Sequence, residues 1–318
     1  IDTIVDGILN CHIGDLRIER IKFSGFIGEP LLSPATLVAA ASLTGAGRRV
    51  GLFTNGILMH NRTWEILSRI DYVHVSLDAG STSFYWLKEP KTYPYTMETF
   101  QKVMHNIASL NQRRKQDQTS LRINVGYVIV PGNHEHILDV TMKVRDAGAD
   151  SIRFKCDIGG RHNLNKRPEA LEVAYAQIDR ARNEVQDLPR FAVHTIHSRE
   201  DIISKSYARW NCSDGCYYQR FLGTIGSDGN AYLCDHNTMP GGIPLGNIIN
   251  ATFQEVWESD RRRYIASGIE YTCQSPVCPP FGNRVNFFLR EIEDLRQTYG
   301  VEALMSAVKR VRSELLSP

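Results

Sequence analysis

Short runs of β-branched and aromatic residues alternate with longer amphipathic stretches over the first two thirds of the chain. Most of the short runs lack a strict alternation of apolar and polar residues, which is typical of strands covered on both faces. The predicted strands are residues 21–24, 50–54, 72–77, 121–128, 151–155 and 191–195. The predicted helices between them are residues 63–70, 96–110, 135–147 and 168–185. This order predicts a parallel sheet with right-handed crossovers, either doubly wound or a full or partial barrel.

The pattern changes after the last of these strands. Two short apolar runs, residues 221–225 and 230–233, flank the turn Gly226-Ser227-Asp228-Gly229 and predict a β-hairpin. A polar helix is expected over residues 253–265, followed by a loop rich in cysteine and proline. The chain is expected to end in two amphipathic helices separated by Gly300.

The composition is that of an ordinary globular protein and limits the classes of partner. The 318 residues include 37 Lys and Arg against 35 Asp and Glu, a net charge of +2. So balanced a charge does not predict binding to nucleic acid or to an anionic membrane. The longest purely apolar runs, such as residues 37–41, are far shorter than the roughly 20 residues of a membrane span. The clusters Arg113-Arg114-Lys115 and Arg261-Arg262-Arg263 are expected to be solvated helix ends.

Seven cysteines are spread unevenly along the chain. Cys11 and Cys156 stand alone and are expected to be buried core thiols. The other five crowd into one stretch and are Cys212, Cys216, Cys234, Cys273 and Cys278. An odd number of cysteines without a visible signal peptide argues against a disulfide framework and for a reducing, cytoplasmic location. Because clustered thiols in such a compartment more often bind metal, this stretch is a candidate metal site.

Polar residues and glycines recur where the predicted strands end. They are Gly28-Glu29-Pro30, Thr54-Asn55-Gly56, Ser76-Leu77-Asp78, Asn124 with Val128 to Pro131, and Lys155-Cys156-Asp157, in strand order. Ligands of parallel α/β sheets bind at the carboxyl ends of the strands. We therefore expect these groups to share one ligand.

The first three of these segments, in strand order, resemble the radical S-adenosylmethionine (radical SAM) enzymes. The resemblance covers about residues 1–198 as a partial (β/α)6 TIM-like barrel that lacks its first strand in this chain. It extends over about residues 205–280 as an auxiliary iron-sulfur module of the SPASM or twitch type. The expected α/β chain has three parts, namely the barrel at residues 1–200, the auxiliary module at 201–283 and C-terminal helices at 284–318.

The resemblance implies how the methionine part of S-adenosylmethionine is held. Gly28, Glu29 and Pro30 correspond to the family's GGEP turn, which holds the amino group, although Ile27 replaces its first glycine. Thr54 and Asn55 correspond to the second-strand turn near the same part of the cofactor.

The remaining site residues are assigned by the same resemblance. Ser76 and Asp78 correspond to the polar pair near the carboxylate and the ribose, and Asn124 corresponds to a ribose contact. Val130, followed by Pro131, is expected to flank the adenine. The expected catalytic residues are Lys155 and Asp157, which lie at the end of the fifth strand and would face the substrate.

The family's defining CxxxCxxC loop, which ligates the 4Fe-4S cluster that cleaves the cofactor, is absent from the sequence. Cys11 cannot replace it, because no cysteine follows at either spacing. Since the chain begins with Ile1 inside an amphipathic stretch, we expect the motif within roughly 30 residues upstream, after a β-strand. The alternative is a degenerate relative that has lost the chemistry.

The spacing of the clustered cysteines fits one auxiliary 4Fe-4S cluster. Cys216-x12-Gly229-x4-Cys234 matches the opening of SPASM-type modules, and Cys273-x4-Cys278 supplies a second pair. Four thiolates from these segments can converge on one soft metal centre, with Cys212 as an alternate ligand. A structural zinc site is the competing interpretation, since the same spacings suit tetrahedral thiolate coordination.

Two functions follow from this resemblance, and a third follows from the zinc interpretation of the cysteines. In the first, a 5'-deoxyadenosyl radical removes hydrogen from a small polar metabolite, such as a sugar, aminoglycoside or nucleoside of natural-product or antibiotic biosynthesis. The reaction would be that of an oxidoreductase or lyase, namely dehydrogenation, dehydration or decarboxylation. Arg161 and His162 are further candidate anchors for such a molecule. The second is maturation of a ribosomal peptide or protein, and the third is a non-catalytic zinc-binding scaffold. A reducing partner such as flavodoxin or ferredoxin is expected for either enzyme.

Overall fold

Six parallel strands form the sheet of the first of two units into which the chain divides, residues 1–207 and 208–318. The computed structural model describes residues 1–25, 28–77, 97–157, 164–203, 215–238, 241–268 and 280–316. The strands are neighbours in chain order and are β3 (Arg20–Phe23), β4 (Arg49–Thr54), β5 (Tyr72–Ser76), β6 (Arg122–Ile129), β7 (Ser151–Cys156) and β8 (Ala192–Thr195). All six predicted strands are therefore confirmed, while a further strand before Ile1 stays a prediction.

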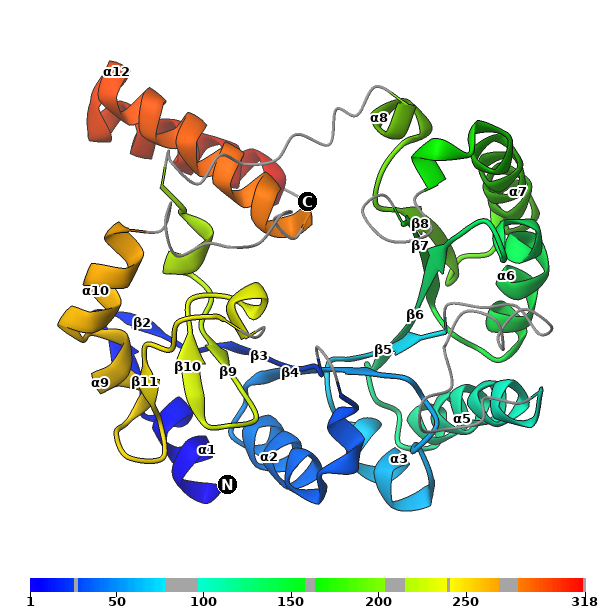
Figure 1. Ribbon diagram of the computed structural model, residues 1–318, viewed down its shortest axis with the longest axis horizontal. Helices are drawn as coiled ribbons and strands as arrows, with labels where there is room; N and C mark the ends of the chain where they lie inside the picture. The colour runs from blue at the N-terminus through cyan, green and yellow to red at the C-terminus, as the bar shows by residue number, and fades with distance from the viewer. Residues whose placement is uncertain are drawn as a thin grey trace. The chain divides into compact units, whose positions relative to one another are not determined.

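Helices connect the strands and cover the outer side of the curved sheet (Figure 1). They are α2 (Pro34–Gly45), α3 (Asn61–Leu67), α5 (Met97–Gln116), α6 (Ile137–Asp146) and α7 (Pro168–Val185), with short 3-10 helices η1 (Pro30–Leu32), η2 (His134–His136) and η3 (Leu164–Lys166). The first unit also contains α1 (Asp2–Leu9), α8 (Arg199–Ile203) and a small hairpin of β1 (His12–Ile13) and β2 (Leu16–Arg17). This arrangement confirms an α/β unit of partial-barrel type. No helix in the described ranges has the length and hydropathy needed to cross a membrane.

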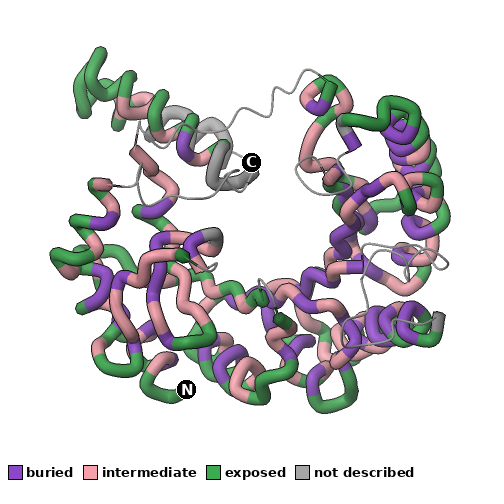
Figure 2. Tube along the Cα trace, in the orientation of Figure 1, coloured by how far each residue is buried: buried purple, intermediate pink, exposed green. Residues whose placement is uncertain are grey.

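The two faces of the sheet differ sharply in polarity. Residues that face the helices are apolar and have at most 1% of their surface exposed, namely Val50, Leu52, Val73, Val75, Ile123, Val125, Ile152 and Phe154. Figure 2 shows this core as buried stretches that follow the strands. From Ile152 onward β7 alternates between buried and exposed residues, with Arg153 and Lys155 exposed on the inner face. Gly51 and His74 are buried there, as the uninterrupted runs predict.

His74 lies in the middle of the inner face and is packed among its neighbours. Its ring lies against the ring of Phe53, with centroids 4.4 Å apart and an interplanar angle of 33°. Its Nε2 occupies the space beside Gly126, where a Cβ atom would approach to 2.4 Å. Burial, together with the positive charges of Arg153 and Lys22, lowers the pKa of His74 to about 3. The imidazole is therefore uncharged at neutral pH.

The second unit contains a three-stranded antiparallel sheet. Its order is β11 (Gly246–Asn247), β10 (Asn230–Tyr232) and β9 (Thr224–Ile225), so the predicted hairpin is confirmed and gains a third strand. The Asp228 side chain closes the turn by accepting hydrogen bonds from the backbone N–H of Asn230 at 3.0 Å and from the hydroxyl of Tyr232 at 2.9 Å. Two 3-10 helices, η5 (Tyr218–Arg220) and η6 (Asp235–Thr238), flank this hairpin in the sequence.

Three α-helices complete the described part of the second unit, α9 (Phe253–Trp257), α10 (Asp260–Ser267) and α12 (Pro280–Leu316). The single helix expected over residues 253–265 is wrong, because Ser259 caps a new helix by accepting a hydrogen bond from the N–H of Arg262 at 3.1 Å. The break expected at Gly300 is confirmed, since its φ of 79° and ψ of 166° interrupt α12.

Two arginines expected to be solvated are instead held by the fold. The Arg262 guanidinium stacks on Trp257, 3.9 Å from the ring centroid, and donates to the side-chain oxygen of Gln219 at 2.9 Å. Arg114 retains only 14% side-chain exposure and donates to Asp150 Oδ2 at 2.5 Å. Both guanidinium groups donate hydrogen bonds to protein oxygens, although Nε of Arg262 is buried without a hydrogen-bond partner.

Arg114 ties together the end of α5 and the beginnings of two strands. It donates to the carbonyls of Leu121 at 2.8 Å and Gly148 at 2.9 Å, which precede β6 and β7. Asp150 accepts in addition from the N–H of Ile123 at 2.7 Å. Removal of the guanidinium would leave this carboxylate and the two carbonyls without their partner.

The variant Arg114→Met is expected to lower the free energy of unfolding by about 3 kcal/mol, because it leaves a partly buried carboxylate unpaired. Urea-induced unfolding measures this loss. The matched control is Arg113→Met, which removes the neighbouring, more exposed pair with Asp117 and should cost much less. Equal losses in the two variants would contradict the structural role of Arg114.

The variant His74→Gln is expected to remove a pH-dependent loss of stability. Because the folded pKa of about 3 lies below the ordinary value of 6.5, only the unfolded state takes up the proton between these values. The natural protein therefore loses stability as the pH falls from 6.5 toward 3. Relative to the variant, its unfolding free energy should fall by up to about 1.4 kcal/mol per pH unit. Urea unfolding at about pH 7.5 and about pH 4.5 measures the difference, which would stay constant if His74 titrated normally.

Candidate active site

The carboxylate of Glu29 joins the turn after β3 to the end of β4. Its Oε1 accepts hydrogen bonds from the N–H of Leu31 at 3.1 Å and from the hydroxyl of Thr54 at 2.8 Å, and its Oε2 accepts from the N–H of Asn55 at 2.7 Å. Glu29 is also the N-cap of η1, which begins at Pro30. The structure therefore brings Glu29, Pro30, Thr54 and Asn55 together at the carboxyl edge of the sheet.

Gly28 completes this group and leaves open space beside it. Its backbone is exposed, and nothing lies within 4 Å of the point where a Cβ atom would stand. An exposed glycine beside a bound carboxylate allows a ligand to approach the backbone closely.

The segment after β4 forms a turn that is fixed by its own side chains. The hydroxyl oxygen of Thr54 accepts from the N–H of Gly56 at 3.1 Å, and Oδ1 of Asn55 accepts from the N–H of Ile57 at 3.0 Å. Gly56 has a φ of +79°, and a Cβ atom there would lie 2.9 Å from the side chain of Val75. Glycine is required at this position for both reasons.

Asn106 on α5 holds this turn from behind and was missed from the sequence. Its side-chain nitrogen donates to the carbonyl of Gly56 at 2.7 Å, and only 3% of the residue is exposed. The available signal was its position: Asn106 shares the buried side of the helix with Val103 and Ile107, which are fully buried. A lone polar residue on a buried helical face must find a hydrogen-bond partner.

The residues predicted on the third and fourth strands lie at two levels of the inner face. Ser76 is paired in register with Gly126, at the end of β5. Asn124 lies two residues earlier on β6, and its Oδ1 accepts from the hydroxyl of Ser151 at 2.8 Å. Asn124 is therefore one layer below Ser76, and Asp78 lies outside the described residues.

Asn133 fixes the turn that follows β6. Its Oδ1 accepts from the N–H of Val130 at 2.9 Å, and its Nδ2 donates to the carbonyl of Val128 at 2.8 Å. Val130 is 6% exposed and Asn133 is fully buried. The predicted adenine-flanking residue Val130 is thus held rigidly where the strand ends, just before Pro131.

The two expected catalytic residues lie at the end of β7. Lys155 is exposed on the inner face, and Asp157 donates its N–H to the carbonyl of the last residue of β6 at 3.0 Å. Cys156 between them turns to the helix side, where burial raises its pKa to about 11. The core position expected for this thiol is confirmed, whereas Arg161 and His162 lie outside the described residues.

Two of the four predicted cluster ligands lie in the described part of the second unit. The sulfur of Cys216 lies 3.6 Å from Nδ2 of Asn286, a fully buried residue of α12 whose Oδ1 accepts from the N–H of Tyr218 at 2.7 Å. The sulfur of Cys234, directly after β10, lies 3.7 Å from Oδ1 of Asn237.

The other thiols, Cys212, Cys273 and Cys278, lie outside the described residues. Within the described ranges, no three His, Cys, Asp or Glu side chains converge as a metal site. The complete ligand set therefore stays a prediction. Cys11 is 1% exposed, as expected for a core thiol.

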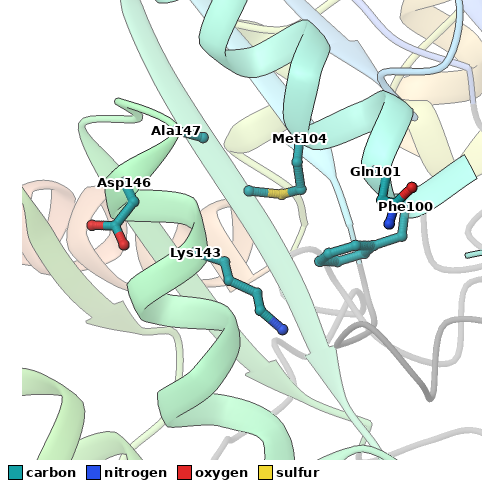
Figure 3. Close-up of a pocket in the computed structure, with 6 residues that line it drawn as sticks. All are labelled: Phe100, Gln101, Met104, Lys143, Asp146 and Ala147. Atoms are coloured by element: carbon teal, nitrogen blue, oxygen red, sulfur yellow. The ribbon is translucent and has the colours of Figure 1, made fainter. Parts of the chain in front are cut away.

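A pocket of about 390 Å³ lies between α5 and α6 on the outer side of the first unit (Figure 3). It is lined by Phe100, Gln101, Met104, Lys143, Asp146 and Ala147. Lys143 is paired with Asp139 on its own helix at 2.7 Å. Since none of the predicted site residues lines it, this pocket is separate from the candidate active site.

Comparison with known families identifies the module in the second unit. Residues 216–279 match the SPASM family of iron-sulfur cluster-binding domains. The matched span begins at Cys216 and includes Cys234, Cys273 and Cys278, whereas Cys212 precedes it. The prediction of a SPASM-type module in this region is confirmed.

Other proteins that resemble this chain are more distant. The dTDP-4-amino-4,6-dideoxy-D-glucose ammonia-lyase of Streptomyces venezuelae is 27% identical over 183 residues, which are 54% of this chain and 37% of that protein. Streptococcus suis SuiB bound to S-adenosylmethionine has a similar fold, with a TM-score of 0.56 and 14% identity over 79% of this chain and 56% of SuiB. SuiB bound to its precursor peptide SuiA matches with a TM-score of 0.54, 15% identity and the same coverage.

These matches differ in what they establish. The SuiB structures show a shared fold alone at this level of identity, and the chain spans only about half of SuiB and less of the ammonia-lyase. Together with the SPASM match, they confirm the resemblance of this chain to radical SAM enzymes that carry a SPASM module.

Proposed function

We propose that this chain is the cofactor-binding and auxiliary-cluster part of a radical SAM enzyme, an oxidoreductase or lyase, whose substrate is a small polar metabolite such as a sugar, aminoglycoside or nucleoside. The observation that carries the proposal is the carboxylate of Glu29, which bonds to both Thr54 and Asn55. Two motifs read separately from the sequence thus form one site, and a SPASM domain follows in the same chain.

The group around Glu29 suits the amino group of a methionine moiety. A carboxylate offers about four acceptor positions, and three donors already bind to Glu29. The neighbouring Gly28 has open space beside it, and an ammonium group there would make a charge-assisted hydrogen bond to a remaining acceptor of Glu29. When bound, S-adenosylmethionine together with a 4Fe-4S cluster would supply a hydrogen-abstracting radical.

The other cofactor contacts follow the order of the strands. Thr54 and Asn55 would position the methionine part, and Ser76 and Asp78 the carboxylate and ribose. Asn124 would contact the ribose from one layer below. The backbone of Val130, held by Asn133, would flank the adenine.

Lys155 and Asp157 would face the substrate. The exposed Lys155 offers a cation on the inner face, and Asp157 follows directly at the strand end. Charged groups of this kind orient a polar substrate by charge-assisted hydrogen bonds. The name of the Streptomyces venezuelae relative, an ammonia-lyase of an amino sugar carried on dTDP, supports a sugar substrate and a lyase reaction.

Peptide maturation is the second candidate function. The fold match to SuiB bound to its precursor peptide SuiA favours it. The sugar-type substrate ranks first because the ammonia-lyase match is one of sequence at 27% identity, whereas the SuiB match is one of fold at 15%.

The auxiliary cluster is proposed to be one 4Fe-4S centre bound by Cys216, Cys234, Cys273 and Cys278. The SPASM match spans all four and favours iron-sulfur over zinc. The buried amide of Asn286 beside Cys216 would donate a hydrogen bond to a cysteine sulfur, an interaction that tunes cluster potentials. A flavodoxin or ferredoxin would supply electrons, in a cytoplasmic setting.

The variant Glu29→Gln in the full-length, cluster-loaded protein is expected to weaken S-adenosylmethionine binding by about tenfold to a hundredfold, because it removes the charge and places an NH2 group among three donors. Equilibrium dialysis with the labelled cofactor measures the affinity. Glu19→Gln, at an exposed carboxylate before β3, is the control. Unchanged affinity in a normally folded Glu29→Gln protein would contradict the assignment.

Replacement of both Cys216 and Cys234 by alanine is expected to lower the iron content by about four atoms per chain, since a 4Fe-4S cluster needs four thiolates. Iron and sulfide assays with the visible absorbance spectrum measure the loss. Cys156→Ala, at a buried core thiol, should leave the iron content unchanged. Tightly bound zinc that is lost from the double variant, with iron unchanged, would favour the scaffold hypothesis instead.

A further inference from the structure

The inner face of the sheet concentrates positive charge that the overall composition hides. The six strands of the parallel sheet contain no Asp or Glu. They contain six Lys and Arg residues, which are Arg20, Lys22, Arg49, Arg122, Arg153 and Lys155. Strand alternation and register place all six on the inner face, because the intervening residues form the buried core. Arg20, Arg49 and Arg122 stand at the starts of their strands, where Arg49 pairs with Asp71 at 3.1 Å. Lys22, Arg153 and Lys155 lie farther along their strands, toward the carboxyl edge of the sheet.

Lys22 and Arg153 lie on either side of the packed rings of Phe53 and His74. Lys22 Nζ lies 5.4 Å from the ring centroid of Phe53, which lies against His74. On the other side, His74 reaches across Gly126, the residue paired in register with Arg153. Because Gly126 has no side chain, the imidazole and the guanidinium are neighbours across the strand between them.

No Asp or Glu belongs to the six strands of the sheet. Among the described residues, Arg153 forms no ion pair, and its side chain is exposed. Desolvation by its surroundings lowers the pKa of Arg153, yet a guanidinium stays charged in proteins. His74 is neutral and can donate one N–H without adding charge. The polar pair of Asn124 and Ser151 borders the same layer.

We propose that this inner face binds a phosphate or diphosphate group of the substrate, with Lys22 and Arg153 as its charged contacts and the rings of Phe53 and His74 as its floor. The proposal deepens the proposed function by naming the substrate class, a phosphorylated or nucleotide-linked small molecule, and it rests on that function. The guanidinium fork of Arg153 binds the oxygens of such a group in pairs, and the ammonium of Lys22 adds a second charge-assisted contact.

A concave surface with one sign of charge also raises the local concentration of anions. The cofactor brings one carboxylate, which requires only one cation, and the face carries several. A peptide substrate has no general requirement for a phosphate site, so the charge distribution favours the nucleotide-linked class over a peptide.

The test uses the full-length, cluster-loaded protein with thymidine 5'-diphosphate and inorganic pyrophosphate as probes, measured by isothermal titration calorimetry. Arg153→Gln and Lys22→Gln should each weaken binding of both probes by about tenfold to a hundredfold. Both side chains are exposed, so the fold should tolerate either change. Arg145→Gln on the outer helix α6 is the matched control and should leave the affinities unchanged. Thymidine, which lacks phosphate, should bind far more weakly to the natural protein.

Parallel measurements with S-adenosylmethionine separate the two sources of anionic groups. Its affinity should stay unchanged in Arg153→Gln and Lys22→Gln. Loss of cofactor affinity with unchanged diphosphate affinity would assign these cations to the cofactor carboxylate and overturn the proposal. Failure of either probe to bind the natural protein would also overturn it, and so would binding that neither substitution weakens.

The proposed function fails by a different result, namely a natural protein that neither binds S-adenosylmethionine nor forms 5'-deoxyadenosine under reducing conditions. The diphosphate titrations need no turnover. The two failures are therefore distinguishable in one set of samples.

Discussion

A carboxylate that accepts hydrogen bonds from two different segments is the constraint on which the candidate site depends. Glu29 follows β3, whereas Thr54 and Asn55 belong to the end of β4, and the chain between them forms a complete helix. Two of the three hydrogen bonds of Glu29 cross between the segments, where β3 ends opposite Leu52 and β4 continues to Thr54. Charge-assisted bonds of this kind are stronger than neutral ones. They therefore fix the relative position of the two turns.

The sheet assigns its two faces to different tasks. Helices pack against its outer face and form an apolar core with it. Within this core, the side chain of Asn106 donates a hydrogen bond to the turn at Gly56. On the inner face the Lys and Arg side chains are exposed, whereas Gly51, His74, Gly126 and Ser151 are buried. One set of strands thus supplies both the stability of the unit and a surface that can vary with the ligand.

The strands were predictable because their signal is local. Runs of β-branched residues identified all six, and Pro168 and Gly300 correctly marked a helix start and a helix break. Helix α2 was not expected, since its apolar and small residues show no polar face to set a period. The split between α9 and α10 depends on one side-chain cap at Ser259, which a hydrophobic pattern does not reveal.

Features of the site that depend on register were harder to predict. The grouping of Glu29 with Thr54 came from motif order, but the roles of Asn106, Arg114 and His74 depend on neighbours distant in sequence. Whether a strand residue faces the helices or the inner surface follows from long-range packing. Where apolar residues flank a strand residue on both sides, the sequence does not show which face of the sheet its side chain occupies.

A histidine in the middle of a polar surface is the side chain usually expected to carry protons during a reaction. General acid–base catalysis works best when the pKa of the group lies near the working pH. With a pKa of about 3, His74 is too weak a base to take a proton near neutrality. It acts there as a fixed dipole. Proton transfer at this surface near neutrality would therefore require another group.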